Sequence, residues 1–143
     1  MFVFSDLVMA GLGVGSVDDV ALSVLVSVIG HRDGPHRLLT DGGWMALSRD
    51  RGTADHEVDQ HYGLVLDLDG RPCAELVVVG TNQEHGLVAR RDGAPFDLSR
   101  YPIGTLLRVL PIHACATAAQ HDRYHVVRQD RRIEAVWPRW SGW

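Results

Sequence analysis

The sequence predicts an all-β fold, a closed or partly open β-barrel or sandwich of about eight short strands with one or two short helical turns. Three observations lead to this prediction. Apolar and polar residues alternate over several short runs, which is the period of a strand. Glycine, aspartate and proline separate these runs and are typical of turns. Helical periodicity is sparse along the whole chain.

The first strand is predicted within residues 20–30, VALSVLVSVIG. Its even-numbered residues from 22 to 28 are all apolar, whereas the odd-numbered ones include two serines. Because alternate residues of a strand point to opposite faces, we expect this strand to be buried mainly on one face. A second strand is predicted at residues 35–40 and ends at the turn Asp41-Gly42-Gly43.

A hairpin is predicted around Asp69-Gly70, the strongest short-range turn signal of the chain, with strands at residues 63–68 and 73–79. The further predicted strands are residues 86–90, 105–110, 124–128 and 132–137. Short helical turns are predicted at residues 43–48 and 117–122, and a polar loop at residues 48–61.

Residues 1–19 fit this pattern poorly. They end in the glycine-rich stretch GLGVGSVDD, which matches no nucleotide-binding fingerprint and lacks a strand-to-helix context. We expect a flexible connector here. The predicted organisation is therefore a connector at residues 1–19 and a single β-barrel domain at residues 20–143.

The composition excludes several classes of function. The 143 residues carry a net charge of −4, which gives no basic surface for nucleic acid or an anionic membrane. The longest apolar run is far shorter than the roughly 20 residues of a membrane span. All 14 basic residues are arginines, so the chain lacks the lysine that a Schiff base requires. Two cysteines do not make a disulfide framework, and we expect a reduced, cytoplasmic protein.

The stretch LPIHACATAAQHDRYHVV, residues 110–127, contains the most distinctive chemistry. If the segment is extended, His113 and Cys115 point to the same side and can bind one ion. Imidazole and thiolate both suit zinc, and a thiolate disfavours Mg²⁺. Further ligands would come from His121, His125, water, substrate or another chain.

Two other interpretations of this stretch remain open. Cys115 can be a small buried apolar residue and His113 a surface residue, and spacing alone favours this interpretation because two-residue matches are common. Cys115 can also be a thiol nucleophile activated by His113 or His121, although no cysteine-protease signature surrounds it.

Other residues have both a functional and a structural interpretation. Glu84 and His85 either orient a ligand histidine through a hydrogen bond or belong to a polar loop. Trp44 and Met45 are expected to be buried against one end of the barrel. The terminal aromatic residues are expected to pack on the domain or on another chain; they are Trp137, Trp140 and Trp143.

Three segments together closely resemble the C-terminal domain of the D-serine dehydratase and D-threonine aldolase family of fold-type III pyridoxal-phosphate enzymes. They are DGGWMALSRDRGT, TNQEHG and LPIHACATAAQHDRYHVV. The resemblance extends over essentially the whole chain, including the N-terminal FVFSDLVMAGLGVGSVDDVALSVL. It implies that a β domain such as this one accompanies an alanine-racemase-like barrel that carries the cofactor lysine, with residues 1–19 as the connector from that barrel.

Spacing alone favours a structural role for the His-x-Cys motif, but the resemblance makes a metal site the favoured interpretation. It implies that His113 and Cys115 hold a catalytic zinc beside the cofactor. His121, Glu84 and His85 are candidates for supporting positions. The aldolase branch has aspartate in place of the cysteine and uses Mn²⁺ or a similar ion, so Cys115 indicates the zinc-using branch.

The resemblance thus implies the metal-binding domain of a pyridoxal-phosphate lyase for a small D-hydroxy amino acid. Without a lysine, the chain is expected to be inactive alone and to meet pyridoxal phosphate only through a barrel supplied in cis or in trans. We also expect a homo-oligomer. The alternative is a non-catalytic β-barrel interaction module that has retained the His-x-Cys motif.

Overall fold

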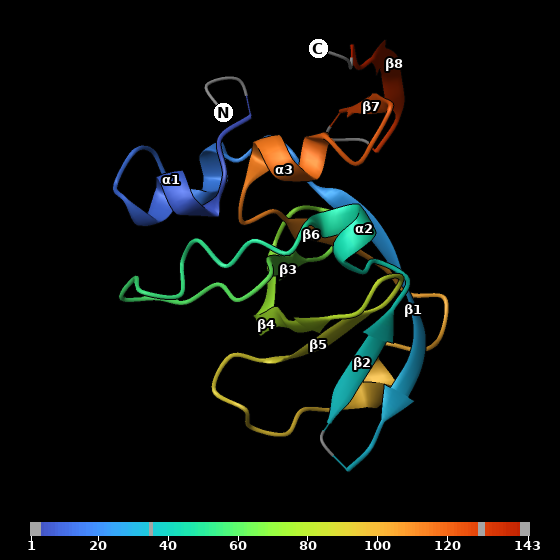
Figure 1. Ribbon diagram of the computed structural model, residues 1–143. Helices are drawn as coiled ribbons and strands as arrows, with labels where there is room; N and C mark the ends of the chain where they lie inside the picture. The colour runs from blue at the N-terminus through green and yellow to red at the C-terminus, as the bar shows by residue number, and fades with distance from the viewer. Residues whose placement is uncertain (1–3, 35, 129–130, 141–143) are drawn as a thin grey trace.

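The computed structural model, described for residues 4–34, 36–128 and 131–140, is a closed six-stranded barrel with an additional two-stranded hairpin (Figure 1). The described residues form only three α-helices, each of five residues or fewer. The all-β prediction is confirmed. No helix of the described part has the length and apolar character needed to cross a membrane.

All eight predicted strands are present. They are β1 (Val24–Arg32), β2 (Arg37–Thr40), β3 (Leu64–Leu66), β4 (Pro72–Thr81), β5 (Gly86–Arg90), β6 (Leu106–Leu110), β7 (Arg123–Val127) and β8 (Ile133–Pro138). The helices are α1 (Leu7–Gly11), α2 (Trp44–Leu47) and α3 (Ala114–Ala118), with short 3₁₀ turns η1 (Val17–Asp19) and η2 (Leu98–Arg100). The predicted turns at 43–48 and 117–122 correspond to α2 and α3, and α3 begins earlier than predicted.

The barrel closes in the order β1-β2-β5-β4-β3-β6, and every neighbouring pair is antiparallel. The predicted hairpin at Asp69-Gly70 joins β3 to β4. Gly70 has a φ of 83°, in the left-handed region that favours glycine, which explains the strength of this turn signal.

The main core fills the barrel interior. Val24, Val26 and Val28 of β1 are buried, whereas Leu25 on the opposite face is 60% exposed, as the alternation predicted. The buried members of this cluster are Val24, Val26, Val28, Leu38, Leu47, Val65, Leu76, Val78, Val88, Leu107 and Val109.

A second apolar cluster covers the outside of the barrel wall. Its buried members are Leu7, Val20, Leu64, Leu66, Val77, Leu110 and Ile112. Adjacent residues of β3 belong to the two different clusters, so this strand is buried on both faces. The outer cover includes Leu7 of α1, which is 1% exposed.

The N-terminal segment, predicted as a flexible connector, contains regular structure in its described part. Residues 7–11 form α1 and residues 17–19 form η1. Asp6 caps α1 by accepting a hydrogen bond from the backbone N–H of Met9, which explains why the helix begins there. The glycine-rich part that follows has positive φ at Gly13 and Gly15.

Strands β7 and β8 form a separate sheet outside the barrel. Neither strand has a fully buried face, so neither lines the core. The hairpin instead contacts the N-terminal segment, where the rings of Phe4 and Tyr124 have centroids 5.0 Å apart. Figure 1 shows α1, α3 and this hairpin gathered beyond the same end of the barrel.

The predicted burial of the large apolar side chains is only partly correct. Trp44 is half-buried, but Met45 is 45% exposed, because the single turn of α2 directs Leu47 into the core instead. Trp137 and Trp140 are 52% and 92% exposed and do not pack on the domain. Trp143 lies outside the described residues.

Two adjacent leucines of β6 provide a test of the barrel core. Leu107 is 2% exposed and Leu106 is 44% exposed. Leu107→Ala should lower the free energy of unfolding by about 2–5 kcal/mol, because it leaves a cavity in the main core. Leu106→Ala should cost about 1 kcal/mol or less. Urea denaturation of both variants measures the difference, and equal losses would contradict the assigned strand orientation.

Candidate metal site

His113 and Cys115 lie at the beginning of α3. His113 is the N-cap residue, with extended backbone at φ −133° and ψ 106°, and Cys115 lies in the first turn with an exposed side chain. The extended conformation, the condition under which both side chains would point to the same side, is thus present at His113 but not at Cys115. The helix forms because Ala114, Thr117 and Ala118 are buried beneath it, with Thr117 Oγ1 donating to the carbonyl of Leu47 at 2.6 Å.

The imidazole of His113 is held by a carboxylate. Its Nδ1 lies 2.7 Å from Oδ2 of Asp50, and the two side chains are 37% and 44% exposed. Because an ionised carboxylate only accepts hydrogen bonds, Nδ1 carries the proton. In a neutral imidazole with this tautomer, the lone pair of Nε2 is the one that a metal ion would bind, which is the usual arrangement of a ligand histidine oriented by a carboxylate.

Asp50 belongs to the predicted polar loop at residues 48–61, which is cross-linked internally. The backbone N–H of Asp50 donates to Ser48 Oγ at 3.3 Å. Further along, the buried Thr53 donates to Asp59 Oδ1 at 3.2 Å and accepts from the backbone N–H of Gln60 at 2.9 Å. These hydrogen bonds order the loop on both sides of Asp50 without regular secondary structure.

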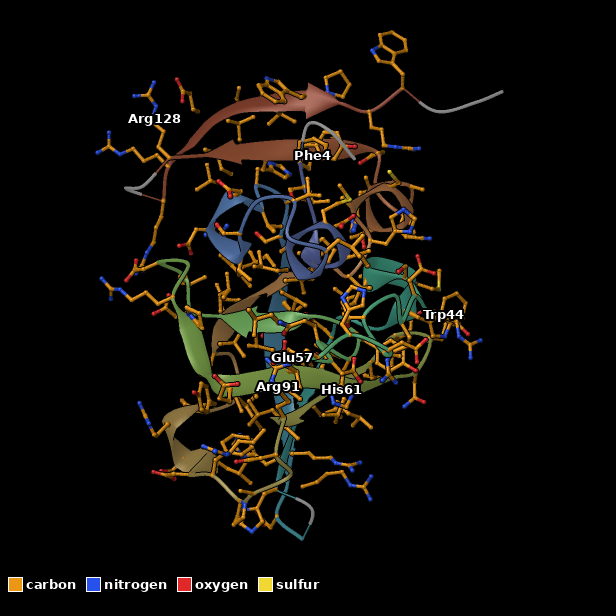
Figure 2. The ribbon with its side chains drawn as sticks, turned by 90° about the vertical axis from the view of Figure 1, so that its left-hand side faces the viewer. Phe4, Trp44, Glu57, His61, Arg91 and Arg128 are labelled. Carbon is orange, nitrogen blue, oxygen red and sulfur yellow. The ribbon has the colours of Figure 1, made fainter. Side chains whose placement is uncertain are left out.

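Charged groups reinforce the far end of this loop. Arg51 pairs with Asp59 at 2.5 Å, and Arg91 donates to the backbone carbonyl of Asp59 and to Gln60 Oε1. Burial is the largest effect on His61 and lowers its pKa; Asp59 opposes this, and the charges of Arg51 and Arg91 lower the pKa further. His61 and Arg91 lie on the face of the molecule turned to the viewer in Figure 2.

A hollow of ≈ 350 Å³ lies beside His113. It is lined by Asp6, Val8, Asp50, Arg51, Gly52 and His113. The loop that carries Asp50 and the N-terminal segment therefore form its walls together with the candidate ligand.

The residues predicted to support the site have other surroundings in the structure. Nε2 of His121 donates to the carbonyl of Ala46 at 3.0 Å, so this histidine fastens the end of α3 to α2. Glu84 and His85 are exposed in the β4–β5 connection. The structure places Asp50 at Nδ1 of His113, in the position for which Glu84 and His85 were candidates. His125 lies on β7, on the strand after the motif.

The two cysteines have different surroundings. Cys115 is exposed, whereas Cys73 on β4 is half-buried against the main core, and no disulfide joins them. Burial raises the pKa of Cys73, and the nearby charge of Asp67 raises it further. Within the described ranges, no group of three or more His, Cys, Asp and Glu side chains is arranged to hold a metal ion.

Sequence reasoning missed Asp50 and Asp6 as parts of this site. Asp50 lies 63 positions before His113, and one aspartate among several in a polar loop gives no local signal. Asp6 does have a signal, since an aspartate immediately before the apolar run LVMA is typical of a helix N-cap.

The family described as "Putative serine dehydratase domain" matches residues 21–127. The D-threo-3-hydroxyaspartate dehydratase of Delftia sp. (strain HT23) is 50% identical over 145 residues, which cover 100% of this chain and 38% of that enzyme. The D-serine dehydratase of Dictyostelium discoideum is 31% identical, and the match covers 92% of this chain and 33% of that protein. The chain thus spans about a third of the length of these two relatives.

Solved structures of the D-threo-3-hydroxyaspartate dehydratase agree closely with this fold. The enzyme from Delftia sp. HT23 superposes with a TM-score of 0.93 at 50% identity, covering 98% of this chain and 37% of that chain. Two variant structures have the same TM-score of 0.93. One replaces a histidine by alanine, and the other, in the metal-free form, replaces the cysteine two positions further along.

One relative matches this chain over most of its own length. An uncharacterized protein of Mycobacterium tuberculosis (strain ATCC 25618 / H37Rv) is 30% identical over 119 residues. The match covers 81% of this chain and 80% of that protein.

The surroundings of the two thiols predict unequal reactivity. Near neutral pH, iodoacetamide should modify Cys115 much faster than Cys73, because Cys115 is exposed whereas Cys73 is half-buried and its pKa is raised. Mass spectrometry of timed samples measures both rates. Cys115→Ala should remove the fast phase, and denaturant should make the two rates similar. Equal rates in the folded protein would contradict the assigned surroundings.

Proposed function

The chain belongs to the serine dehydratase domain family, and we propose that it is the metal-binding domain of a pyridoxal-phosphate-dependent lyase for small D-3-hydroxy amino acids. In this proposal His113 and Cys115 are the two protein ligands of a zinc ion. Asp50 orients the imidazole, and water or substrate completes the coordination.

The observation that carries this proposal is the geometry around His113. The hydrogen bond of Nδ1 to Asp50 leaves Nε2 available, and the exposed thiol of Cys115 follows two residues later. The donor set fits zinc, since imidazole nitrogen and thiolate sulfur are its usual ligands, and a thiolate disfavours harder ions such as Mn²⁺ and Mg²⁺.

Variant structures of one relative support the assignment of His113 and Cys115 as metal ligands. In the D-threo-3-hydroxyaspartate dehydratase, the histidine and the cysteine that were replaced by alanine have the spacing of His113 and Cys115. The cysteine variant is in the metal-free form, which favours a metal ligand at the position of Cys115.

A bound zinc ion would supply a Lewis acid for departure of the hydroxyl group from the β-carbon of the substrate. The residues of this chain have positioning roles in that reaction. His113 and Cys115 would hold the ion, and Asp50 would fix the imidazole. Loss of water from D-serine, followed by hydrolysis, gives pyruvate and ammonia.

The cofactor would be held elsewhere. Because this chain has no lysine, we propose that an alanine-racemase-like barrel supplies both the pyridoxal phosphate and its lysine, in the same polypeptide or in a partner. Residues 1–19 are then the connector on the barrel side. The two dehydratase relatives are long enough for such a barrel, since the match covers 38% and 33% of their length.

A second candidate function is a non-catalytic interaction module that retains the His-x-Cys motif. It is favoured by the uncharacterized protein of Mycobacterium tuberculosis, of which the matched region makes up 80%. The domain therefore also occurs in a protein of about its own size.

Zinc titration tests the ligand assignment. The wild-type chain should bind one zinc ion, weakly for a structural site because only two protein ligands contribute. Cys115→Ala and His113→Ala should abolish this binding, since each removes half of the protein ligands. Competition with a chromophoric chelator measures the affinity.

The matched controls are Cys73→Ala and His125→Ala, which remove the same residue types away from the site and should leave zinc affinity unchanged. His121→Ala should weaken binding only partially, through loosened packing of α3 on α2. If wild type and Cys115→Ala bound zinc with the same stoichiometry and affinity, the ligand assignment would be wrong.

A chimera tests the catalytic role. This chain would replace the matching segment of the Delftia enzyme, and production of 2-oxo acid and ammonia would be followed with D-threo-3-hydroxyaspartate and D-serine. The chimera should be active, and Cys115→Ala within it should lower kcat/KM at least about a hundredfold. A folded chimera that binds cofactor and zinc but releases no ammonia would favour the interaction module.

A further inference from the structure

Three consecutive N-terminal residues form hydrogen bonds with the segment that carries the candidate ligands. The carboxylate of Asp6 accepts from the backbone N–H of Ala114 at 2.9 Å. The backbone N–H groups of Leu7 and Val8 donate to the carbonyls of Pro111 and Ile112 at 3.2 and 3.3 Å. We call Asp6, Leu7 and Val8 the N-terminal clamp.

Asp6 is the central residue of the clamp. It is 1% exposed, and both oxygens of its carboxylate are engaged, Oδ1 with the N–H of Met9 at 3.0 Å and Oδ2 with that of Ala114. Hydrogen bonds from backbone N–H groups to a carboxylate are stronger than those to a neutral acceptor. The peptide group between His113 and Ala114 is thereby fixed from one side, at the point where extended backbone changes to helix.

The clamp also contacts the loop that carries Asp50. Val8 packs against Gly52, where a Cβ atom would come within 2.6 Å of Val8 Cγ2. Leu7 anchors the clamp because it is buried in the outer apolar cluster together with Ile112. The clamp therefore touches both the segment of His113 and the loop of its hydrogen-bond partner.

We propose that Asp6 is a positioning residue of the metal site, fixing the backbone between His113 and Cys115 so that imidazole and thiolate are set for one ion before the ion binds. This inference rests on the proposed function of His113 and Cys115 as zinc ligands. The clamp lies outside residues 21–127, the part of the chain that the family match covers.

The physical need for such a residue follows from the local structure. α3 has only five residues, and isolated helices of that length are not stable in water. A site with two protein ligands loses affinity if binding must also order the ligands, because the ordering entropy opposes binding. Because Asp6 already orders the backbone at Ala114 in the folded protein, zinc binding does not have to order it.

The decisive variant is Asp6→Ser. Serine is a good N-cap residue and keeps an acceptor for Met9, but its shorter side chain does not reach Ala114. Zinc affinity should fall about tenfold, the lower end of the effect of residues that orient metal ligands. The thiolate-to-metal charge-transfer band of the Co²⁺-substituted protein should also lose intensity at equal Co²⁺ concentration. Asp6→Asn, which keeps one carbonyl oxygen, should recover part of the affinity.

Two controls separate positioning from general stability. Asp97→Ser changes another N-cap aspartate, which accepts from the N–H of Ser99 on η2, and should leave zinc affinity unchanged. Val88→Ala makes a cavity in the barrel core; it should lower the free energy of unfolding without changing zinc affinity when both proteins are folded.

Unchanged zinc affinity in folded Asp6→Ser and Asp6→Asn would overturn the inference while leaving the ligand assignment intact. Equal loss of affinity in Val88→Ala would overturn it as well, since stability alone would then explain the effect. Failure of the proposed function is a separate result, because the wild-type chain and Cys115→Ala would then bind zinc equally before any change at Asp6.

Discussion

The burial of β3 on both faces is the constraint on which the rest of the structure depends. Val65 points into the barrel, whereas Leu64 and Leu66 point outward and must be covered by other parts of the chain. The cover includes Leu7 and Ile112, which are 1% exposed. Complete burial of one such side chain contributes about 1.5–3 kcal/mol. Because the outward-facing leucines of β3 must be buried, the N-terminal segment and the chain after β6 both pack against this strand.

The position of the candidate ligands follows from this packing. Leu7 and Ile112 are adjacent in sequence to Asp6 and His113, so burying the two apolar residues together brings the aspartate and the histidine segment side by side. The hydrogen bond from Ala114 to Asp6 then defines where α3 begins. The loop of Asp50 completes the arrangement through the hydrogen bond of Asp50 with Nδ1 of His113.

The sequence predicted the parts of the fold that depend on local pattern. Period-two alternation located all eight strands, and Asp69-Gly70 located the β3–β4 hairpin, because a turn and a strand face are encoded within a few residues. Alternation could not separate β7 and β8 from the barrel, since it does not specify which strands close a sheet. The Asp50–His113 and Asp6–Ala114 contacts span 63 and 108 positions, and no local pattern reports contacts at such separations.

At a catalytic metal, a small number of protein ligands leaves coordination positions open, and rigid positioning of those ligands raises the metal affinity. Additional ligands would raise affinity but would occupy the coordination positions that water and substrate need. Preorganisation raises affinity without occupying them, because it removes an entropic cost instead of adding a bond. In the proposed site, Asp50 holds the imidazole and Asp6 holds the backbone beside the thiol, so the support comes from outside the coordination sphere.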